Sequence, residues 1–300
     1  MTIAQNFPDA VTLGEPIRAH GLSVFPLFRM NAGLTAFATL AQALEAGHAR
    51  IGEAKDTPGP WYRHVEVHNL GGMPILVRDG DLIQGGQQDR VADHPVWIAA
   101  GETTVVPVSC VEQNRSHYEE GQIDFCMASS QATPAFRRHR MAHRDQASTW
   151  AFVAESRREA GLANGAGSVA EVMRDRRERV ASMAQDFRLP AEACGVVVAR
   201  RRGAKARVEL VEWFSQPEAF RSTWEALVTS VLEEEGRNQP SPRISRTEVR
   251  KVLGKFREAS RRDRHVSTEA HVEGFEHNGL LGWATGVGDE LVHVAATHAG

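Results

Sequence analysis

Short apolar runs, separated by turn residues roughly every 8–12 positions, dominate the first 115 residues. The runs at 22–28, 62–68, 75–77, 96–99 and 104–112 are of strand length. In the run at 62–68, Val65 and Val67 share one face, as expected of a strand with one buried side. Pro26 indicates an edge position or a bend in its strand. We therefore predict a β-sandwich or barrel-like sheet over roughly residues 10–115.

Helical spacing becomes prominent in the second half of the chain. It predicts helices at 145–158, 168–187, 217–232 and 245–256, and the last begins with the capping box Ser245-x-x-Glu248. A short helix is also predicted earlier, from Thr39 to Gly47. Residues 130–144 are basic and are predicted to form a loop with a helical turn.

Alternating patterns also occur in the second half, at 195–200, at 208–214 and from 266 onward, and they predict strands between these helices. The expected fold class is therefore α+β, with strand pairs covered by helices in the C-terminal half. We expect one domain over residues 1–300, which can be divided into a β-rich part, 10–115, and an α+β part, 145–300.

The composition is that of a globular chain, with 42% apolar and 24% charged residues. No apolar run approaches the roughly 20 residues that a membrane helix needs, so we expect no membrane association. The N-terminus lacks a basic stretch followed by an apolar one. Three widely spaced cysteines form no C-x-x-C pair, which favours a reducing, cytoplasmic location.

The two parts of the chain carry opposite net charge. Residues 1–134 hold 8 Lys/Arg and 15 Asp/Glu (−7), and residues 135–300 hold 27 and 23 (+4). The basic residues are clustered, but acidic residues interleave in most clusters, as on solvated helix faces. Only 2 tyrosines occur and no series of stacking aromatics is evident. We therefore do not expect nucleic-acid binding.

The most unusual polar segment is 79–90, DGDLIQGGQQDR. The glycine pair interrupts a strand and indicates a bulge or a close approach of the backbone to another group. Arg90 offers a bidentate fork for phosphate or carboxylate, and the neighbouring amides can read a base or a sugar. The alternative is a structural hairpin in which Arg90 pairs with a nearby acid.

Three further residues are candidates for a functional site: Cys110, Glu112 and Asp145. Cys110 stands mid-strand among valines, where a buried core thiol is expected more than a nucleophile. Glu112, at the end of that strand, is the better catalytic candidate, although an ion pair with Arg115 is a simpler interpretation. Asp145 is most simply the N-cap of its helix.

Metal and cofactor signals are weak. The pairs His64/His68 and His139/His143 lack a third ligand. The G-x-G-x-x-A match at 165–170 follows a helix and not a strand, unlike a dinucleotide fingerprint. We predict neither a metal nor a cofactor.

The segments 79–90 and 107–115 (PVSCVEQNR) resemble a bacterial family named for its gene neighbours, the ARG (ADP-ribosylglycohydrolase) and rhodanese-phosphatase-superfamily-associated protein domain. Weaker matches occur from residue 13 to 292–294 and span nearly the whole chain. Gln87 replaces a lysine of the family pattern and Asp89 an asparagine.

The resemblance implies a nucleotide-type ligand such as ADP-ribose, either bound or processed. Under this hypothesis Arg90 and Arg115 hold phosphate, Gln88 and Asp79 orient the sugar or base, and Glu112 or Asp145 acts as an acid–base. The alternative is a non-enzymatic module that recruits a partner protein, with the polar motif as a structural hairpin. The sequence leaves open whether the protein is an enzyme.

Overall fold

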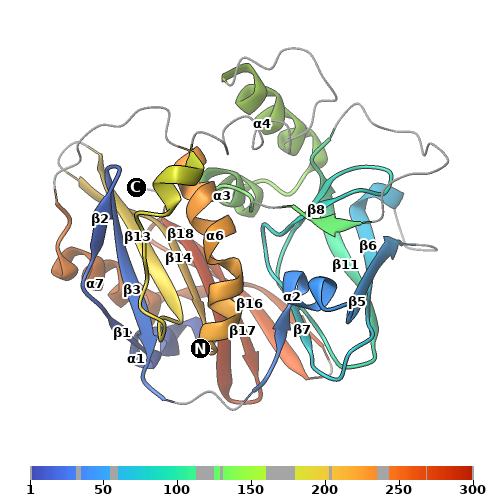
Figure 1. The fold of residues 1–300 in the computed structure, drawn as a ribbon, viewed down its shortest axis with the longest axis horizontal. Helices are drawn as coiled ribbons and strands as arrows, with labels where there is room; N and C mark the ends of the chain where they lie inside the picture. Colours follow the sequence, from blue (N-terminus) through green and yellow to red (C-terminus); the bar gives the residue numbers. More distant parts are fainter. Residues whose placement is uncertain are drawn as a thin grey trace. The chain divides into compact units, whose positions relative to one another are not determined.

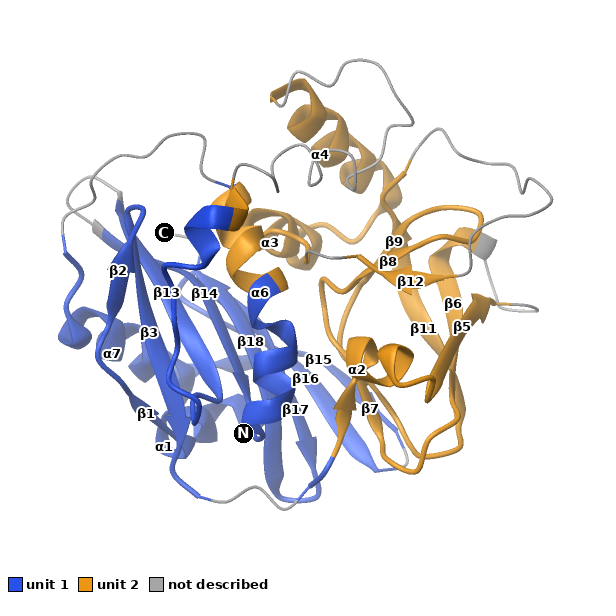
Figure 2. Ribbon diagram, in the orientation of Figure 1, with its two compact units in different colours: residues 1–36, 182–225, 234–300 blue, residues 37–181, 226–233 orange. Residues whose placement is uncertain are grey.

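Strands far apart in the sequence pair with one another in the computed structural model (Figure 1). It describes residues 2–31, 35–54, 60–112, 125–128, 131–159, 180–202, 205–234, 243–267 and 269–298. Two compact units result (Figure 2): unit 1 contains residues 1–36, 182–225 and 234–300, and unit 2 contains residues 37–181 and 226–233. The first strands thus belong with the C-terminal part of the chain, and not with the rest of the β-rich stretch 10–115.

Unit 1 is built on an antiparallel sheet that has nine strands among the described residues, in the order β1-β3-β13-β14-β18-β17-β16-β15, with β2 also paired to β3. The strands are β1 (Val11–Leu13), β2 (Ile17–Ala19), β3 (Leu22–Arg29), β13 (Gly195–Arg202), β14 (Lys205–Phe214), β15 (Ser260–Val266), β16 (Ala270–His277), β17 (Leu280–Val287) and β18 (Glu290–His298). The predicted strands at 22–28, 195–200 and 208–214 and in the C-terminal tail are confirmed.

One face of this sheet carries an apolar core covered by short helices. They are η1 (Ile3–Asn6), α1 (Phe7–Ala10), α7 (Arg246–Gly254) and η3 (Lys255–Glu258). Phe7 packs between Trp213 of β14 and Phe256 of η3, with ring centroids 5.8 and 4.9 Å away. The predicted capping box of α7 is present, because Ser245 and Glu248 each accept from the other's backbone amide. Helix α6 (Pro217–Glu233) follows β14, and its Phe220 contacts Phe214.

Pro26 lies in a strand that is paired on both sides, and therefore not at a sheet edge. It is opposite Val196 of β13, and its carbonyl accepts from Gly14, in the interval between β1 and β2. The missing N–H of proline is tolerated here because neither β1 nor β2 pairs with residue 26.

Unit 2 contains a six-stranded sheet in the order β12-β8-β9-β11-β6-β5 and a three-stranded sheet in the order β10-β7-β4, both counted over the described residues. The elements are β4 (Ala38–Thr39), α2 (Leu40–Glu45), β5 (Ala49–Glu53), η2 (Trp61–Arg63), β6 (His64–Asn69), β7 (Ile75–Val77), β8 (Leu82–Gln84), β9 (Arg90–Ala92), β10 (Val96–Ile98), β11 (Thr103–Cys110), β12 (Cys126–Met127), α3 (Pro134–Ala142) and α4 (Gln146–Glu159). Both sheets contribute to one apolar core, which includes Val77, Val106 and Leu40 of α2.

Residues 134–142 form a regular helix, α3, and the prediction of a loop with a single helical turn for this stretch is wrong. Thr133 caps the helix through the amide of Phe136, and Pro134 occupies its first turn. Two of its arginines, Arg137 and Arg140, are buried. The acids that neutralise these arginines are Asp79 and Asp93, which lie 58 and 47 residues earlier in the chain. The sequence around the helix therefore resembled a solvated basic segment.

The α+β class is confirmed. Most of the predicted helix 168–187 lies outside the described residues, as does the G-x-G-x-x-A segment. No helix in the described ranges is long and apolar enough to cross a membrane.

Candidate functional site

The motif 79–90 forms the β8–β9 hairpin, and its glycine pair is the tip. Gly85 and Gly86 both have positive φ, 108° and 54°. A Cβ at Gly86 would collide with the ring of Phe125 and would lie 2.6 Å from the Glu53 carboxylate. The expected close approach of the backbone is thus present, and the groups approached are a phenyl ring and a carboxylate of the same unit.

Glu53, the last residue of β5, lies outside this hairpin and accepts hydrogen bonds from two of its residues. Its Oε1 accepts from the amide of Gln87 (2.8 Å), and its Oε2 accepts from Arg90 (2.7 Å). Arg90 is fully buried, also donates to the carbonyl of Gln88 (2.9 Å), and places its guanidinium 5.5 Å from the centre of the Phe125 ring. Its charge is therefore neutralised inside the protein.

Glu112 contacts the same loop from the end of β11. It is 4% exposed, and its Oε2 accepts from the amide of Asp89 at 3.1 Å. Asp89 in turn accepts from the amide of Gly85 and, through its carbonyl, from Val111. These carboxylates satisfy buried backbone donors, as hairpin tips without regular ladder bonds require.

Cys110 is a core thiol, as predicted. It is fully buried, and its Sγ donates to the carbonyl of Glu112 (3.0 Å). Burial raises the pKa of the Cys110 thiol above its ordinary value, so the thiol is protonated at neutral pH.

Asp79 lies at the opposite end of β8 from the glycine tip. It forms a bidentate ion pair with Arg137 of α3, with N–O distances of 2.9 and 2.8 Å, and both side chains are buried. This pair connects the β-hairpin to α3.

Asp145 is exposed and caps α4. It accepts from the amide and the hydroxyl of Ser148 at 2.8 and 2.6 Å, and these bonds lower the pKa of its carboxyl group. The residue that reaches the core from this turn is Gln146, whose side-chain amide bonds both the N–H and the C=O of Cys110.

The structure therefore brings together Gln88, Arg90 and Glu112 and places Asp79 and Asp145 in separate contacts. Arg115 lies outside the described residues. Sequence reasoning missed Glu53 and Phe125, which complete the cluster. No local signal marks them, because they join Arg90 from 37 and 35 positions away along the chain.

A hollow of about 460 Å³ adjoins this cluster. It is lined by three residues from each of α2, β5 and β12 and its flank: Ala41, Leu44, Glu45, Ala49, Arg50, Ile51, Phe125, Cys126 and Met127. Strands β5 and β12 are the two ends of the six-stranded order, so the hollow lies where the two edges of one sheet approach each other.

The lining of the hollow combines apolar and charged groups. Leu44, Ile51 and Phe125 provide apolar surface, and Arg50 and Glu45 are exposed at the rim. Phe125 links the hollow to the motif, because its ring contacts Gly86 and lies over Arg90. The hairpin thus packs against Phe125, one of the residues that line the hollow.

The segments 79–90 and 107–115 suggest membership of a particular family, and a comparison with protein-family models tests that suggestion. The family model of the ARG and rhodanese-phosphatase-superfamily-associated protein domain matches residues 10–297. The chain belongs to this family. No curated protein and no solved structure matches it. The family match covers both units and includes the hairpin, Glu53, and the hollow.

One histidine of each pair makes an ordinary polar contact. His139 bonds the carbonyl of Ser148, and its ring lies 4.9 Å from that of His143. His68 bonds the hydroxyl of Thr103. In the described parts of the chain, no group of three or more His, Cys, Asp or Glu side chains is arranged to hold a metal ion.

Proposed function

We propose that this family member binds a nucleotide-type ligand of the ADP-ribose class in the hollow between β5 and β12. The observation that carries the proposal is the combination, in one hollow of about 460 Å³, of the Phe125 ring with the exposed side chains of Arg50 and Glu45. Small-molecule sites typically measure about 300–1,000 Å³ and are mostly apolar with a few placed polar groups.

Each group has a matching part of such a ligand. The Arg50 guanidinium can bind a diphosphate through two parallel hydrogen bonds. Phe125 offers an aromatic ring against which a base can stack. Glu45 can accept from the hydroxyls of a ribose. The family's name associates it with ADP-ribosylglycohydrolases, and this association is consistent with the ligand class.

In this proposal the motif residues support the site and do not touch the ligand. Arg90 is held by Glu53 and lies against the Phe125 ring, and Glu112 fixes the tip of the hairpin through Asp89. We assign binding and no chemical step to the hollow, because the carboxylates predicted to be catalytic, Glu112 and Asp145, are engaged elsewhere.

Titration calorimetry with ADP-ribose tests the proposal. We expect Arg50→Ala to weaken binding by at least about tenfold, the value of one charge-assisted contact. Arg158→Ala is the matched control, because Arg158 is 76% exposed on α4 and is not part of the hollow. Absence of heat with the wild type, or equal affinity in Arg50→Ala, would refute the proposal.

Cys126 provides a second readout, because it is exposed within the hollow. Partial desolvation of the sulfur and the nearby Asp89 raise the pKa of this thiol, so alkylation should be measured near pH 9. Bound ADP-ribose should slow alkylation of Cys126, and inorganic phosphate should not. Unchanged alkylation at saturating ADP-ribose would place the ligand elsewhere.

A second candidate function is recruitment of a protein partner. It is favoured by one observation: β5 and β12 are terminal strands of their sheet, and an extended peptide can pair with such an edge. A photo-crosslinking residue at position 50 should then capture a partner that the same residue at position 158 does not. Capture at both positions, or at neither, counts against recruitment at this edge.

A further inference from the structure

The six-stranded sheet of unit 2 is open on one side. Its order runs from β12 to β5, and in the described parts of the chain no ladder joins these two terminal strands. The hollow lies in this gap, with residues 49–51 on one wall and residues 125–127 on the other. Because terminal strands have unpaired backbone groups on their free sides, contacts other than a ladder must fix the distance between the walls.

Helix α2 makes one connection across the gap. It contacts both β5 and β12, and its Leu44 lines the hollow. Leu44, Phe125 and Met127 pack against the same apolar core of unit 2. Such packing is not directional, so it leaves the orientation of the two walls less defined than a polar contact would.

Glu53 makes the polar connection. It is the last residue of β5, and its carboxylate accepts from the amide of Gln87 (2.8 Å) and from Arg90 (2.7 Å). Both donors belong to the β8–β9 hairpin, and β8 is the strand with which β12 pairs. One carboxylate thus joins the β5 edge to the strand beside the β12 edge.

The connection extends to Phe125 on the opposite wall. A Cβ at Gly86 would lie 2.6 Å from Oε1 of Glu53 and 2.2 Å from Cζ of Phe125, so this glycine is in contact with both groups. Arg90 also meets both, because it bonds Glu53 and its guanidinium lies 5.5 Å from the centre of the Phe125 ring. The place of the ring relative to β5 therefore depends on Glu53.

The pair of Glu53 and Arg90 is suited to hold this position. The Arg90 side chain is 0% exposed and that of Glu53 is 20% exposed, so water screens the pair little. Charge-assisted hydrogen bonds of this length are roughly twice as strong as neutral ones. A buried guanidinium that loses its acid is left without compensation, which opposes separation of the two groups.

We propose that Glu53 is the positioning residue of the hollow: its carboxylate bridges the open side of the sheet and sets the distance between Arg50 and Phe125. Glu53 does not line the hollow, so it acts through Phe125 and does not touch a ligand. Without this bridge β5 and β12 move apart, and one ligand no longer contacts both walls. The consequence for ADP-ribose rests on the proposed function, whereas the bridge itself does not.

Glu53→Gln is the variant that tests the bridge. It keeps the size of the side chain and one acceptor oxygen, but removes the charge that holds Arg90. Glu66→Gln is the matched control. Glu66 stands on the neighbouring strand β6, its side chain is 27% exposed, and its ion-pair contact is with His68 of its own strand, at 3.9 Å.

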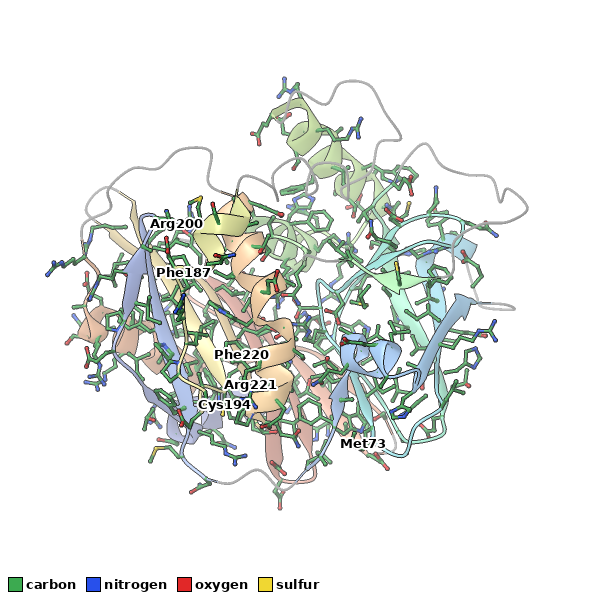
Figure 3. All side chains as sticks on the ribbon, in the orientation of Figure 1. Met73, Phe187, Cys194, Arg200, Phe220 and Arg221 are labelled. Atoms are coloured by element: carbon green, nitrogen blue, oxygen red, sulfur yellow. The ribbon has the colours of Figure 1, made fainter. Side chains whose placement is uncertain are left out.

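Spin labels on the two walls measure the width of the hollow in the full chain. One label is attached to Cys126, which is exposed, and the other to Arg50→Cys. Cys110 and Cys194 (Figure 3) are buried and stay unlabelled. Dipolar broadening of the spectrum should decrease when Glu53→Gln is added and should be retained in the matched control. Unchanged broadening in Glu53→Gln would overturn the proposal.

Gly86→Ala tests the same bridge by a second route, because the added methyl group has no room between Glu53 and Phe125. Gly80→Ala is its control: Gly80 also has a positive φ (78°), and its added methyl group would press on Arg137, at 2.9 Å, instead of on Phe125. Only Gly86→Ala should lose broadening. A loss in both variants would show that backbone strain, and not the bridge, controls the width.

Calorimetry with ADP-ribose, on chains that keep Arg50, then tests the positioning role. Glu53→Gln should bind about tenfold more weakly than Glu66→Gln. Equal affinities in the presence of a widened gap would show that Glu53 does not position the site. A wild type that gives no heat refutes the ligand class proposed for the hollow, and the spin-label distances then decide the bridge by themselves.

Discussion

Arg90 shows how one buried cation can organise a loop. Its guanidinium bonds a side chain from another strand and a carbonyl of its own hairpin, and lies over the ring of Phe125. The sequence offered two interpretations of this residue, a ligand-binding fork and an internal ion pair. The internal pair is present, with Glu53 as the acid, and ligand contact by Arg90 has no support in the geometry.

Substitutions of Arg90 and Arg50 should therefore differ in effect. The first should lower the stability of the fold, and the second should weaken ligand binding without lowering stability. Arg90→Ala leaves the carboxylate of Glu53 without its cation, and we expect the free energy of unfolding to fall by about 3–5 kcal/mol. Arg50→Ala should change it by less than about 0.5 kcal/mol, because Arg50 is exposed. Urea denaturation measures both. An Arg90→Ala protein as stable as the wild type would contradict the supporting role.

At the scale of single elements, the two aspartates predicted as site residues anchor different helices. Asp79 joins the β8 hairpin to α3 through a buried bidentate pair, and Asp145 caps α4 at the surface. The two aspartates should therefore contribute different amounts to the free energy of unfolding.

We expect Asp79→Ala to lower the free energy of unfolding by about 3–5 kcal/mol, because Arg137 would remain buried without a counter-charge. Asp145→Ala should cost much less, because it removes only an exposed helix cap. Thermal or urea denaturation of the two variants side by side is the measurement. Equal losses would show that the buried pair with Arg137 stabilises the fold no more than the helix cap does.

The capping box of α7 predicts a pH dependence. Hydrogen bonds from the backbone and side chain of Ser245, together with Arg201, lower the pKa of Glu248 to about 2. A lowered folded pKa means that Glu248 stabilises the fold above the unfolded value of 4.5, and that this contribution disappears as the pH falls toward 2. The side chain is partly solvated, so the effect should be about 1 kcal/mol.

Glu248→Gln should flatten this part of the stability profile between pH 4.5 and 2, measured by urea denaturation at a series of pH values. Glu218→Gln is a suitable control, because Glu218 is exposed and its ion pair with Arg221, three residues on, lies at the surface. An identical profile in wild type and Glu248→Gln would show that the capping box does not carry the dependence.

At the scale of the whole molecule, each unit has an apolar core of its own. Phe25 belongs to the core of unit 1 with Trp213, and Val106 belongs to that of unit 2. Helix α6 contributes to both units, with the division at residues 225 and 226 (Figure 2).

Core substitutions should therefore report on different parts of the chain. Phe25→Ala should destabilise by about 3–5 kcal/mol and shift the unfolding transition of Trp213 to lower urea. Val106→Ala should act mainly on Trp97, which is buried in unit 2. ¹⁹F NMR of fluorotryptophan-labelled protein distinguishes the two signals. Equal shifts of both tryptophans in both variants would show that the units unfold as one.

The sequence by itself determined the local elements, the α+β class and the family. Period-2 and period-3.6 patterns, capping boxes and turn residues act over a few positions, so strands such as β6 and helices such as α7 could be predicted directly. For the motif at 79–90 the sequence offered a structural hairpin as one of two interpretations, and it indicated a bulge or a close backbone approach at the glycine pair. These features depend on neighbours in the chain.

Only the tertiary structure decided which groups meet. Glu53, Arg90 and Phe125 come from β5, β9 and the flank of β12, and Asp79 finds Arg137 across 58 positions. Glu212 and His293, 81 positions apart, are neighbours only because β14 pairs with β18. Strand order is set by the burial of whole sheet faces, which no local pattern encodes. The hollow between β5 and β12 therefore became visible only in the folded chain.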